Sequence, residues 1–128
     1  MPIATLTPLG WIGRAVRAAS DKKAKDITVI DVGSFLAITD HFLICSGGSD
    51  RQVRTITEEI ERLLAEEKRK PIRREGSPEG GWMLLDYGDF VVHVFTDEMR
   101  GFYDLERLWK DAPRPDLPEL AEAREAAG

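Results

Sequence analysis

The fold is decided by residues 42–64, which read FLICSGGSDRQVRTITEEIERLL. The four apolar residues at the start, followed by Ser-Gly-Gly, are typical of a short strand that is buried on both faces and then stops. Ser49 and Gln52 form a capping box, and the apolar residues behind them recur at helical spacing: Val53, Ile56, Ile60, Leu63 and Leu64. This stretch therefore predicts a buried strand, a glycine turn and an amphipathic helix that runs toward Lys70 and ends before Pro71.

The segments on either side supply further elements. Upstream, Thr7-Pro8 caps a predicted helix over about residues 8–24, and the β-branched run 26–32 predicts a second buried strand, followed by a turn or bulge. Downstream, the pattern predicts a short strand at 72–74, an irregular Gly- and Pro-rich segment at 75–81, a hairpin of strands 82–86 and 90–95, and a last core helix over about 98–110. This order predicts a single α/β (α+β) domain with a mixed β-sheet flanked by helices.

The length of the chain agrees with one domain. Its 128 residues, of which 42% are apolar, can form a single core. We expect the domain to occupy residues 1–112, because Pro113, Pro115 and Pro118 interrupt the C-terminal segment and its other residues are rich in Ala and Glu. Residues 113–128 are therefore expected to form a flexible, at most marginally helical tail.

Composition restricts the partners and the compartment. The net charge of −5 repels phosphate overall, which disfavours a protein that coats nucleic acid. The single cysteine, Cys45, allows neither an internal disulfide nor a cage of thiolate metal ligands. The N-terminus lacks the pattern of a secretory signal, and no apolar run approaches about 18 residues. The expected location is the cytoplasm.

One candidate for enzyme chemistry is the turn Ser46-Gly47-Gly48-Ser49. A glycine turn before a helix suits phosphate binding, because the helix N-terminal amides point at an anion. Nucleotidyltransferases with such a turn also carry two Mg²⁺-binding carboxylates on the following strand, where this chain has Pro71-Ile72-Arg73-Arg74. A plain turn with a helix cap is the simpler interpretation, and a nucleotidyltransferase-like enzyme that binds nucleotide there is the alternative function.

Two further groups could carry chemistry. Cys45, His93 and Asp40 could form a nucleophile, a base and an orienting group, although Cys45 lies in an apolar run and a buried thiol is the simpler interpretation. Asp86 and Asp89 could bind a metal, although acidic residues are common in hairpin turns.

The charges are segregated along the chain. Residues 75–98 contain no Lys or Arg but six acidic residues: Glu75, Glu79, Asp86, Asp89, Asp97 and Glu98. Trp82 and Tyr87 lie among them, so this stretch could dock on a basic protein, or it could be a solvated acidic loop with Trp82 in the core. A basic cluster could contact RNA or form a solvated helix end: Arg62, Lys68, Arg69, Lys70, Arg73 and Arg74.

Two sets of residues form an ordered combination over about residues 9–110. The first half contributes Asp26-Ile27, Asp31-Val32, Ile38-Thr39-Asp40, Cys45-Ser46-Gly47, Ser49, Arg51 and Val53. The second half contributes Glu75-Gly76, Trp82, Asp86, Gly88-Asp89, Val92-His93-Val94, Glu98, Arg100, Tyr103, Leu105-Glu106 and Leu108-Trp109. In this specific combination the chain resembles the ribosomal silencing factor family, also called the Iojap family.

The resemblance implies a nucleotidyltransferase-like fold without catalytic carboxylates, and a binding protein that needs no cofactor rather than an enzyme. It implies docking on the large ribosomal subunit, through its protein numbered fourteen, and steric obstruction of the small subunit. It also implies a homodimer when the protein is free. By the same resemblance the docking residues are expected to be Trp82, Met83, Asp86 and Asp89, with Tyr103 and Glu106 as neighbours on the last helix.

Overall fold

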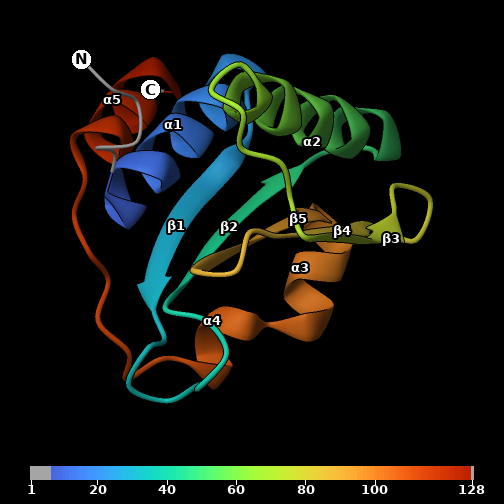
Figure 1. The fold of residues 1–128 in the computed structure, drawn as a ribbon. Helices are drawn as coiled ribbons and strands as arrows, with labels where there is room; N and C mark the ends of the chain where they lie inside the picture. The colour runs from blue at the N-terminus through green and yellow to red at the C-terminus, as the bar shows by residue number, and fades with distance from the viewer. Residues whose placement is uncertain (1–6, 128) are drawn as a thin grey trace.

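The computed structural model describes residues 7–127; residues 1–6, which carry no predicted targeting signal, and Gly128 lie outside the described residues. Five strands form one sheet in the order β1-β2-β5-β4-β3 (Figure 1). The strands are β1 (Lys25–Asp31), β2 (His41–Gly47), β3 (Arg73–Ser77), β4 (Trp82–Asp86) and β5 (Phe90–Thr96). The helices are α1 (Pro8–Asp21), α2 (Asp50–Ala65), α3 (Asp97–Tyr103), α4 (Leu105–Leu108) and α5 (Pro118–Ala127).

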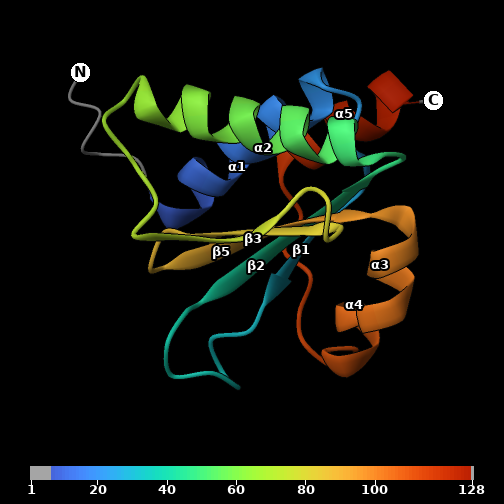
Figure 2. The ribbon, with the colours of Figure 1, turned by 90° about the vertical axis from the view of Figure 1, so that its right-hand side faces the viewer.

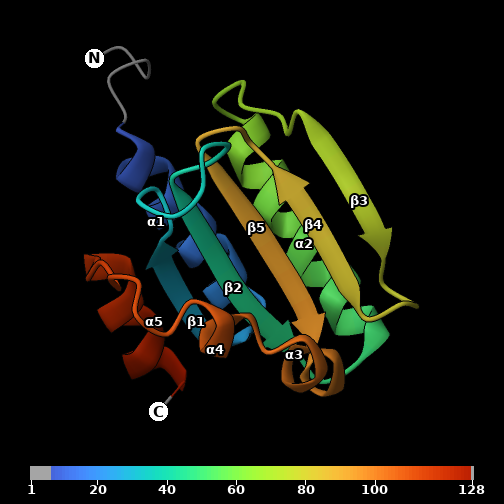
Figure 3. The same cartoon turned by 90° about the horizontal axis from the view of Figure 1, so that it is seen from below.

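The sheet is mixed, and helices cover its two faces unequally. β2 and β5 are parallel neighbours at the centre, and the other neighbouring strands are antiparallel. Helices α1, α2 and α5 lie on one side of the sheet, while α3 and α4 lie on the other (Figure 2). Seen from below, the α3–α4 segment crosses the ends of β2 and β5 and leaves β4 and β3 open (Figure 3). The predicted α+β domain, with a mixed sheet flanked by helices, is confirmed.

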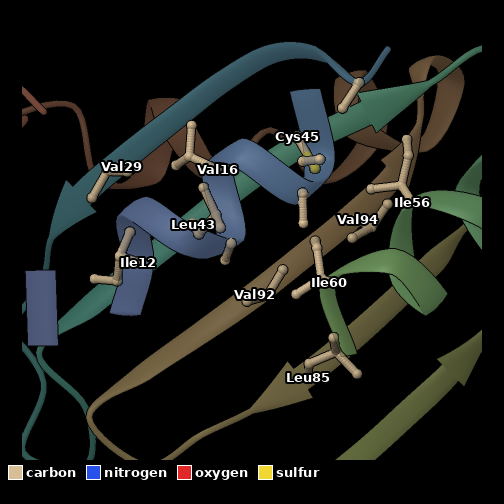
Figure 4. Packing of buried hydrophobic residues seen from close by; sticks show 14 of the residues in the cluster. Ile12, Val16, Val29, Leu43, Cys45, Ile56, Ile60, Leu85, Val92 and Val94 are labelled. Carbon is tan, nitrogen blue, oxygen red and sulfur yellow. The ribbon is translucent and has the colours of Figure 1, made fainter. Parts of the chain in front are cut away.

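The main core lies between the sheet and the helices α1 and α2 (Figure 4). Side chains alternate between the faces of a strand, so every second residue of the central strands points into this core. The labelled members are fully buried or nearly so: Ile12, Val16, Val29, Leu43, Cys45, Ile56, Ile60, Leu85, Val92 and Val94. Both helices begin as predicted, since the hydroxyls of Thr7 and Ser49 accept from the backbone N–H groups of Gly10 and Gln52 at 3.1 Å.

Helix α1 ends at Asp21 rather than near residue 24, and α2 and β3 also differ from their predicted bounds. Helix α2 ends at Ala65 rather than near Lys70, because the chain turns at Lys68, whose φ of 64° is left-handed. Strand β3 continues to Ser77, inside the segment expected to be irregular. Gly76 has a φ of +87°, and a Cβ atom there would lie 2.1 Å from the carbonyl oxygen of Trp82. Glycine therefore permits the close pairing of β3 with β4 rather than preventing a strand.

The prediction of one core helix over residues 98–110 is wrong. The chain forms α3 and α4 instead, separated by Asp104 in the left-handed conformation (φ 49°, ψ 53°). Met99 packs on the open side of the sheet, but Phe102 and Leu108 are 75% and 70% exposed. The apolar periodicity identified the apolar residues of this segment, but it could not show that a residue in the left-handed conformation changes the direction of the chain between them.

The C-terminal segment differs from the expected loose tail. Residues 118–127 form α5, which packs on α1, and three residues of this segment are buried in the main core: Leu117, Leu120 and Ala123. The two helices approach closely at Gly13, where a Cβ atom would lie 2.7 Å from the carboxyl group of Glu119. A helix with few apolar residues is therefore held by the buried side chains of this segment and by its close approach to α1 at Gly13.

Candidate docking surface

The open side of the sheet carries a cluster of aromatic rings that we call the aromatic face: Phe42, Trp82, His93, Phe95 and Tyr103. Trp82 lies at its centre, and its ring centroid is 5.1 Å from that of Phe95 and 4.4 Å from that of Tyr103. Trp82 is half-buried and Tyr103 is 41% exposed. Both rings therefore present aromatic surface to solvent from a fixed position, as protein-interface hot spots do.

His93 holds Trp82 in its orientation. The indole N–H of Trp82 donates to Nδ1 of His93 at 3.2 Å, so the imidazole accepts at Nδ1 and carries its proton on Nε2. Burial lowers the pKa of His93 to about 4, which keeps the ring neutral and the acceptor available at neutral pH.

A hollow of about 240 Å³ lies beside Trp82 and is lined by Glu75, Gly76, Trp82 and Leu84. Leu84 lies on the same side of β4 as Trp82, two residues along the strand. Within residues 7–127, Glu75 forms no ion pair. The hollow thus combines an apolar lining with a free carboxylate. The sequence interpretation missed Leu84, although period-two alternation from Trp82 would have identified it.

The acidic residues of 75–98 are mostly paired, contrary to the expectation of a free acidic stretch. Four of the six bind cations that lie elsewhere in the sequence: Glu79 with Arg54, Asp86 with Arg73, Asp89 with Arg69 and Asp97 with Lys25. Four of the six residues of the basic cluster are paired in the same way, since Arg62 and Arg74 also bind acidic partners on α2. Charge that is segregated along the chain is therefore largely matched in space.

The structure does not bring all the predicted docking residues together. Trp82 and Tyr103 are in contact, whereas Asp86 and Asp89 lie at the far end of β4 and in the turn after it. Met83 is 1% exposed and belongs to the main core, because neighbouring residues of β4 point to opposite faces of the sheet. The side chains predicted to form one patch thus divide between the aromatic face, the hairpin end and the core.

Glu106, the sixth predicted docking residue, lies on α4 and is engaged within the molecule. Its two carboxylate oxygens accept hydrogen bonds from Arg100, at 3.1 Å from Nε and 2.9 Å from Nη2. The side chain of Glu106 is 29% exposed and that of Arg100 is 10% exposed.

Exposed apolar side chains extend the open surface around α3, α4 and the loop before β2: Phe35, Ile38, Phe102 and Leu108. The ring of Phe35 lies 5.8 Å from that of Trp109, which joins the loop to the segment after α4. The sequence interpretation assigned Phe102 and Leu108 to the core. No local signal distinguishes them from buried residues, because their exposure depends on the corner at Asp104.

The glycine turn Ser46-Gly47-Gly48-Ser49 is occupied by the protein's own groups. The backbone N–H of Gly48 donates to the side-chain oxygen of Gln52 at 2.7 Å, and the hydroxyl of Ser49 caps α2. The hollow next to the turn, about 400 Å³, is lined by four carboxylate residues: Asp50, Glu79, Asp97 and Glu98. Glu79 and Asp97 are paired with cations, but Asp50 and Glu98 form no ion pair within residues 7–127, so the lining stays negative and the geometry does not favour the nucleotide-binding alternative.

The candidate group of Cys45, His93 and Asp40 is not assembled. Cys45 points into the main core, while His93 belongs to the aromatic face on the opposite side of the sheet. Burial raises the pKa of the Cys45 thiol to about 12, so its reactive thiolate form is suppressed at neutral pH. Asp40 precedes β2 and lies at the other end of that strand from Ser46.

Neither a metal cluster nor a membrane-spanning helix occurs in the part of the chain that the structure describes. Among residues 7–127, no cluster of three or more His, Cys, Asp or Glu side chains has the arrangement of a metal site. Over the same residues, no helix is both long enough and apolar enough to span a bilayer.

Comparisons with known proteins agree on one family. The family model described as "Ribosomal silencing factor during starvation" matches residues 8–128. Ribosomal silencing factor RsfS of Bacillus subtilis (strain 168) is 45% identical over 103 residues, which make up 80% of this chain and 87% of that protein. The Mus musculus protein named "Mitochondrial assembly of ribosomal large subunit protein 1" is 31% identical over 101 residues, 77% of this chain and 44% of that one.

A crystal structure of a Chromobacterium violaceum protein has a TM-score of 0.78 and 30% sequence identity, and it covers 88% of this chain and 92% of that chain. The resemblance inferred from the ordered motifs is thus confirmed. This chain belongs to the ribosomal silencing factor family.

Proposed function

We propose that this protein represses translation by docking, through the aromatic face, on the large ribosomal subunit, where it blocks association with the small subunit. The family makes it a regulator of translation that acts on the ribosome. The observation that supports docking is the pair of contacting rings Trp82 and Tyr103, which reaches solvent on a side of the sheet that no long helix covers. The name of the mouse relative supports the large subunit as the partner.

The partner surface is that of the large-subunit protein numbered fourteen. Trp82 and Tyr103 form the centre of the contact, and the hollow beside Trp82 receives an apolar side chain of the partner. Glu75 lies at the hollow and attracts a neighbouring Lys or Arg of that partner. Met83 supports β4 from beneath, because its side chain is buried in the core. Asp86 and Asp89 contribute at the rim, where they already hold Arg73 and Arg69.

Steric obstruction requires no catalytic step and no cofactor. A bound body of 14.4 kDa occupies space that the small subunit needs, so the degree of silencing follows occupancy by mass action. Repression would take place in the cytoplasm, where ribosomal subunits join. Lys68 and Lys70 form no ion pair within residues 7–127 and are the members of the basic cluster available to ribosomal RNA.

When the protein is free, a second copy covers the exposed apolar side chains around α3 and α4 and forms a homodimer. Such a surface favours association, because burying Phe102 and Leu108 removes apolar area from water.

The test replaces Trp82 by alanine. A buried interfacial Trp commonly contributes about 2–4 kcal/mol, so Trp82→Ala should weaken cosedimentation with isolated large subunits by roughly thirtyfold or more. The same variant should restore subunit joining when large and small subunits are mixed. Leu9→Ala is the matched control, since Leu9 is an exposed apolar residue on α1, on the other side of the sheet, and should not change binding.

Two results would refute the proposal. If Trp82→Ala folds cooperatively and binds large subunits as tightly as the wild type, the aromatic face is not part of the interface. Normal subunit joining at saturating, confirmed binding would remove steric silencing.

A further inference from the structure

The corner between α3 and α4 is held by one buried cation. Arg100 is 9% exposed, and its guanidinium bonds to four other residues. Besides the two bonds to Glu106, Nη1 donates to the backbone carbonyl of Lys25 at 3.3 Å and to the hydroxyl of Ser46 at 3.2 Å, and Nη2 donates to the hydroxyl of Thr28 at 3.5 Å. Arg100 therefore ties α3 to α4, to β1 and to the end of β2.

The Arg100–Glu106 pair is specific to the bent arrangement. The two residues are six positions apart, and in a continuous α-helix such residues lie about 120° apart around the axis and about 9 Å apart along it. A bidentate bond cannot form across that separation, because only residues three or four positions apart face each other. The apolar periodicity of 98–110 nevertheless suits a continuous helix, so the sequence contains the pattern of a competing straight form.

The bent form requires Asp104 to adopt a left-handed conformation, which is unfavourable for a residue with a Cβ atom. The charge-assisted bonds of Arg100 offset this strain. Tyr103 is the last residue of α3, directly before this corner, and its ring packs on Trp82.

We infer that the Arg100–Glu106 pair positions the aromatic face: it selects the bent corner over a continuous helix and so places Tyr103 on Trp82. Glu106 is then a positioning residue that acts through Arg100, not a contact to the partner. This inference rests on the proposed docking function for its consequence in binding, but the geometry of the free protein tests it independently.

The experiment compares Glu106→Gln, Arg100→Lys and the double variant with the wild type. In the free protein, the indole N–H resonance of Trp82, assigned with Trp82→Phe, reports the bond to His93 and the packing of Tyr103. We expect both single variants to shift or broaden this resonance and to weaken binding to isolated large subunits by about tenfold. The double variant should be no weaker than Arg100→Lys alone, because that variant already lacks the guanidinium that binds Glu106.

Glu98→Gln is the matched control. Glu98 is an exposed acidic residue at the start of α3, and among residues 7–127 it forms no ion pair. The substitution removes the same charge from the same segment and should change neither the resonance nor the binding.

Three results would overturn the inference. The first is weaker binding of Glu106→Gln with an unchanged Trp82 resonance, which indicates that Glu106 contacts the partner directly. The others are additive losses of binding in the double variant, and single variants whose resonance and binding both equal those of the wild type. If Arg100→Lys fails to fold, Glu106→Gln decides by the same two measurements, because Glu106 is the more exposed partner. If the wild type does not bind large subunits, the proposed function fails, while the resonance of the free protein still decides whether the pair positions Trp82 and Tyr103.

Discussion

Lowering the pH should destabilise this protein through His93, by an amount that follows from its burial. The ordinary pKa of histidine is about 6.5, and burial lowers the pKa of His93 to about 4. Between these values the unfolded chain binds a proton that the folded protein excludes, so the free energy of unfolding falls as the pH falls. The full effect is about 3 kcal/mol, of which about 2 kcal/mol is lost between pH 7 and pH 5. Below about pH 4 the loss levels off, because the folded protein then also binds the proton.

The assay is urea unfolding of the wild type and of His93→Gln at pH 7 and at pH 5. Glutamine does not titrate, and its side-chain oxygen can accept the indole N–H of Trp82, so the variant keeps the bond and loses the proton site. Carboxylates titrate equally in both proteins, so their contribution to the pH dependence of the unfolding free energy cancels in the comparison. The decrease in unfolding free energy from pH 7 to pH 5 should be about 2 kcal/mol smaller in the variant. Equal decreases would show that His93 is not desolvated as the structure has it.

Two further substitutions test the packing around the sheet. Leu120→Ala should lower the free energy of unfolding by about 2–4 kcal/mol, because Leu120 is buried in the main core. The control Leu108→Ala, at an exposed residue, should change it by less than about 0.5 kcal/mol. Urea unfolding measures both, and similar values for the two variants would contradict the packing of α5. Asp89→Asn should lower it by about 1–2 kcal/mol, since it leaves the partly buried Arg69 without its carboxylate. Thermal unfolding measures this, with the exposed Asp116→Asn as control, and equal melting temperatures for the two variants would refute it.

Local patterns were sufficient for the parts of the fold that local interactions hold. The capping box at Ser49 and Gln52 placed the start of α2, and the apolar run 42–45 placed the strand before it. The predictions failed where contacts with residues distant in the sequence determine the local structure. Gly76 belongs to a strand because β4 approaches it, Asp104 stands at the corner where Arg100 binds Glu106, and α5 is held because Leu120 and Ala123 are buried in the main core.

The same distinction applies to the candidate site. Trp82 and Tyr103 could be named from their resemblance to the family, and the structure puts the two rings in contact. Whether the acidic residues form ion pairs could not be predicted, because Asp86 and Asp89 bind arginines 13 and 20 residues away in the chain. The burial of Met83, by contrast, follows from alternation along β4 once Trp82 is assigned to the open side.

The parallel pairing of β2 with β5 has a consequence for the time at which this protein becomes active. Ile44 lies beside His93 in the sheet, so the two central strands are joined across about fifty residues of intervening chain. Every residue of the aromatic face except Phe42 lies at position 82 or later. A chain that is still being synthesised can form α1, β1, β2 and α2 but has no aromatic face until Tyr103 and the corner behind it have emerged. Under the proposed function, a nascent chain therefore cannot dock on a ribosome until it is nearly complete.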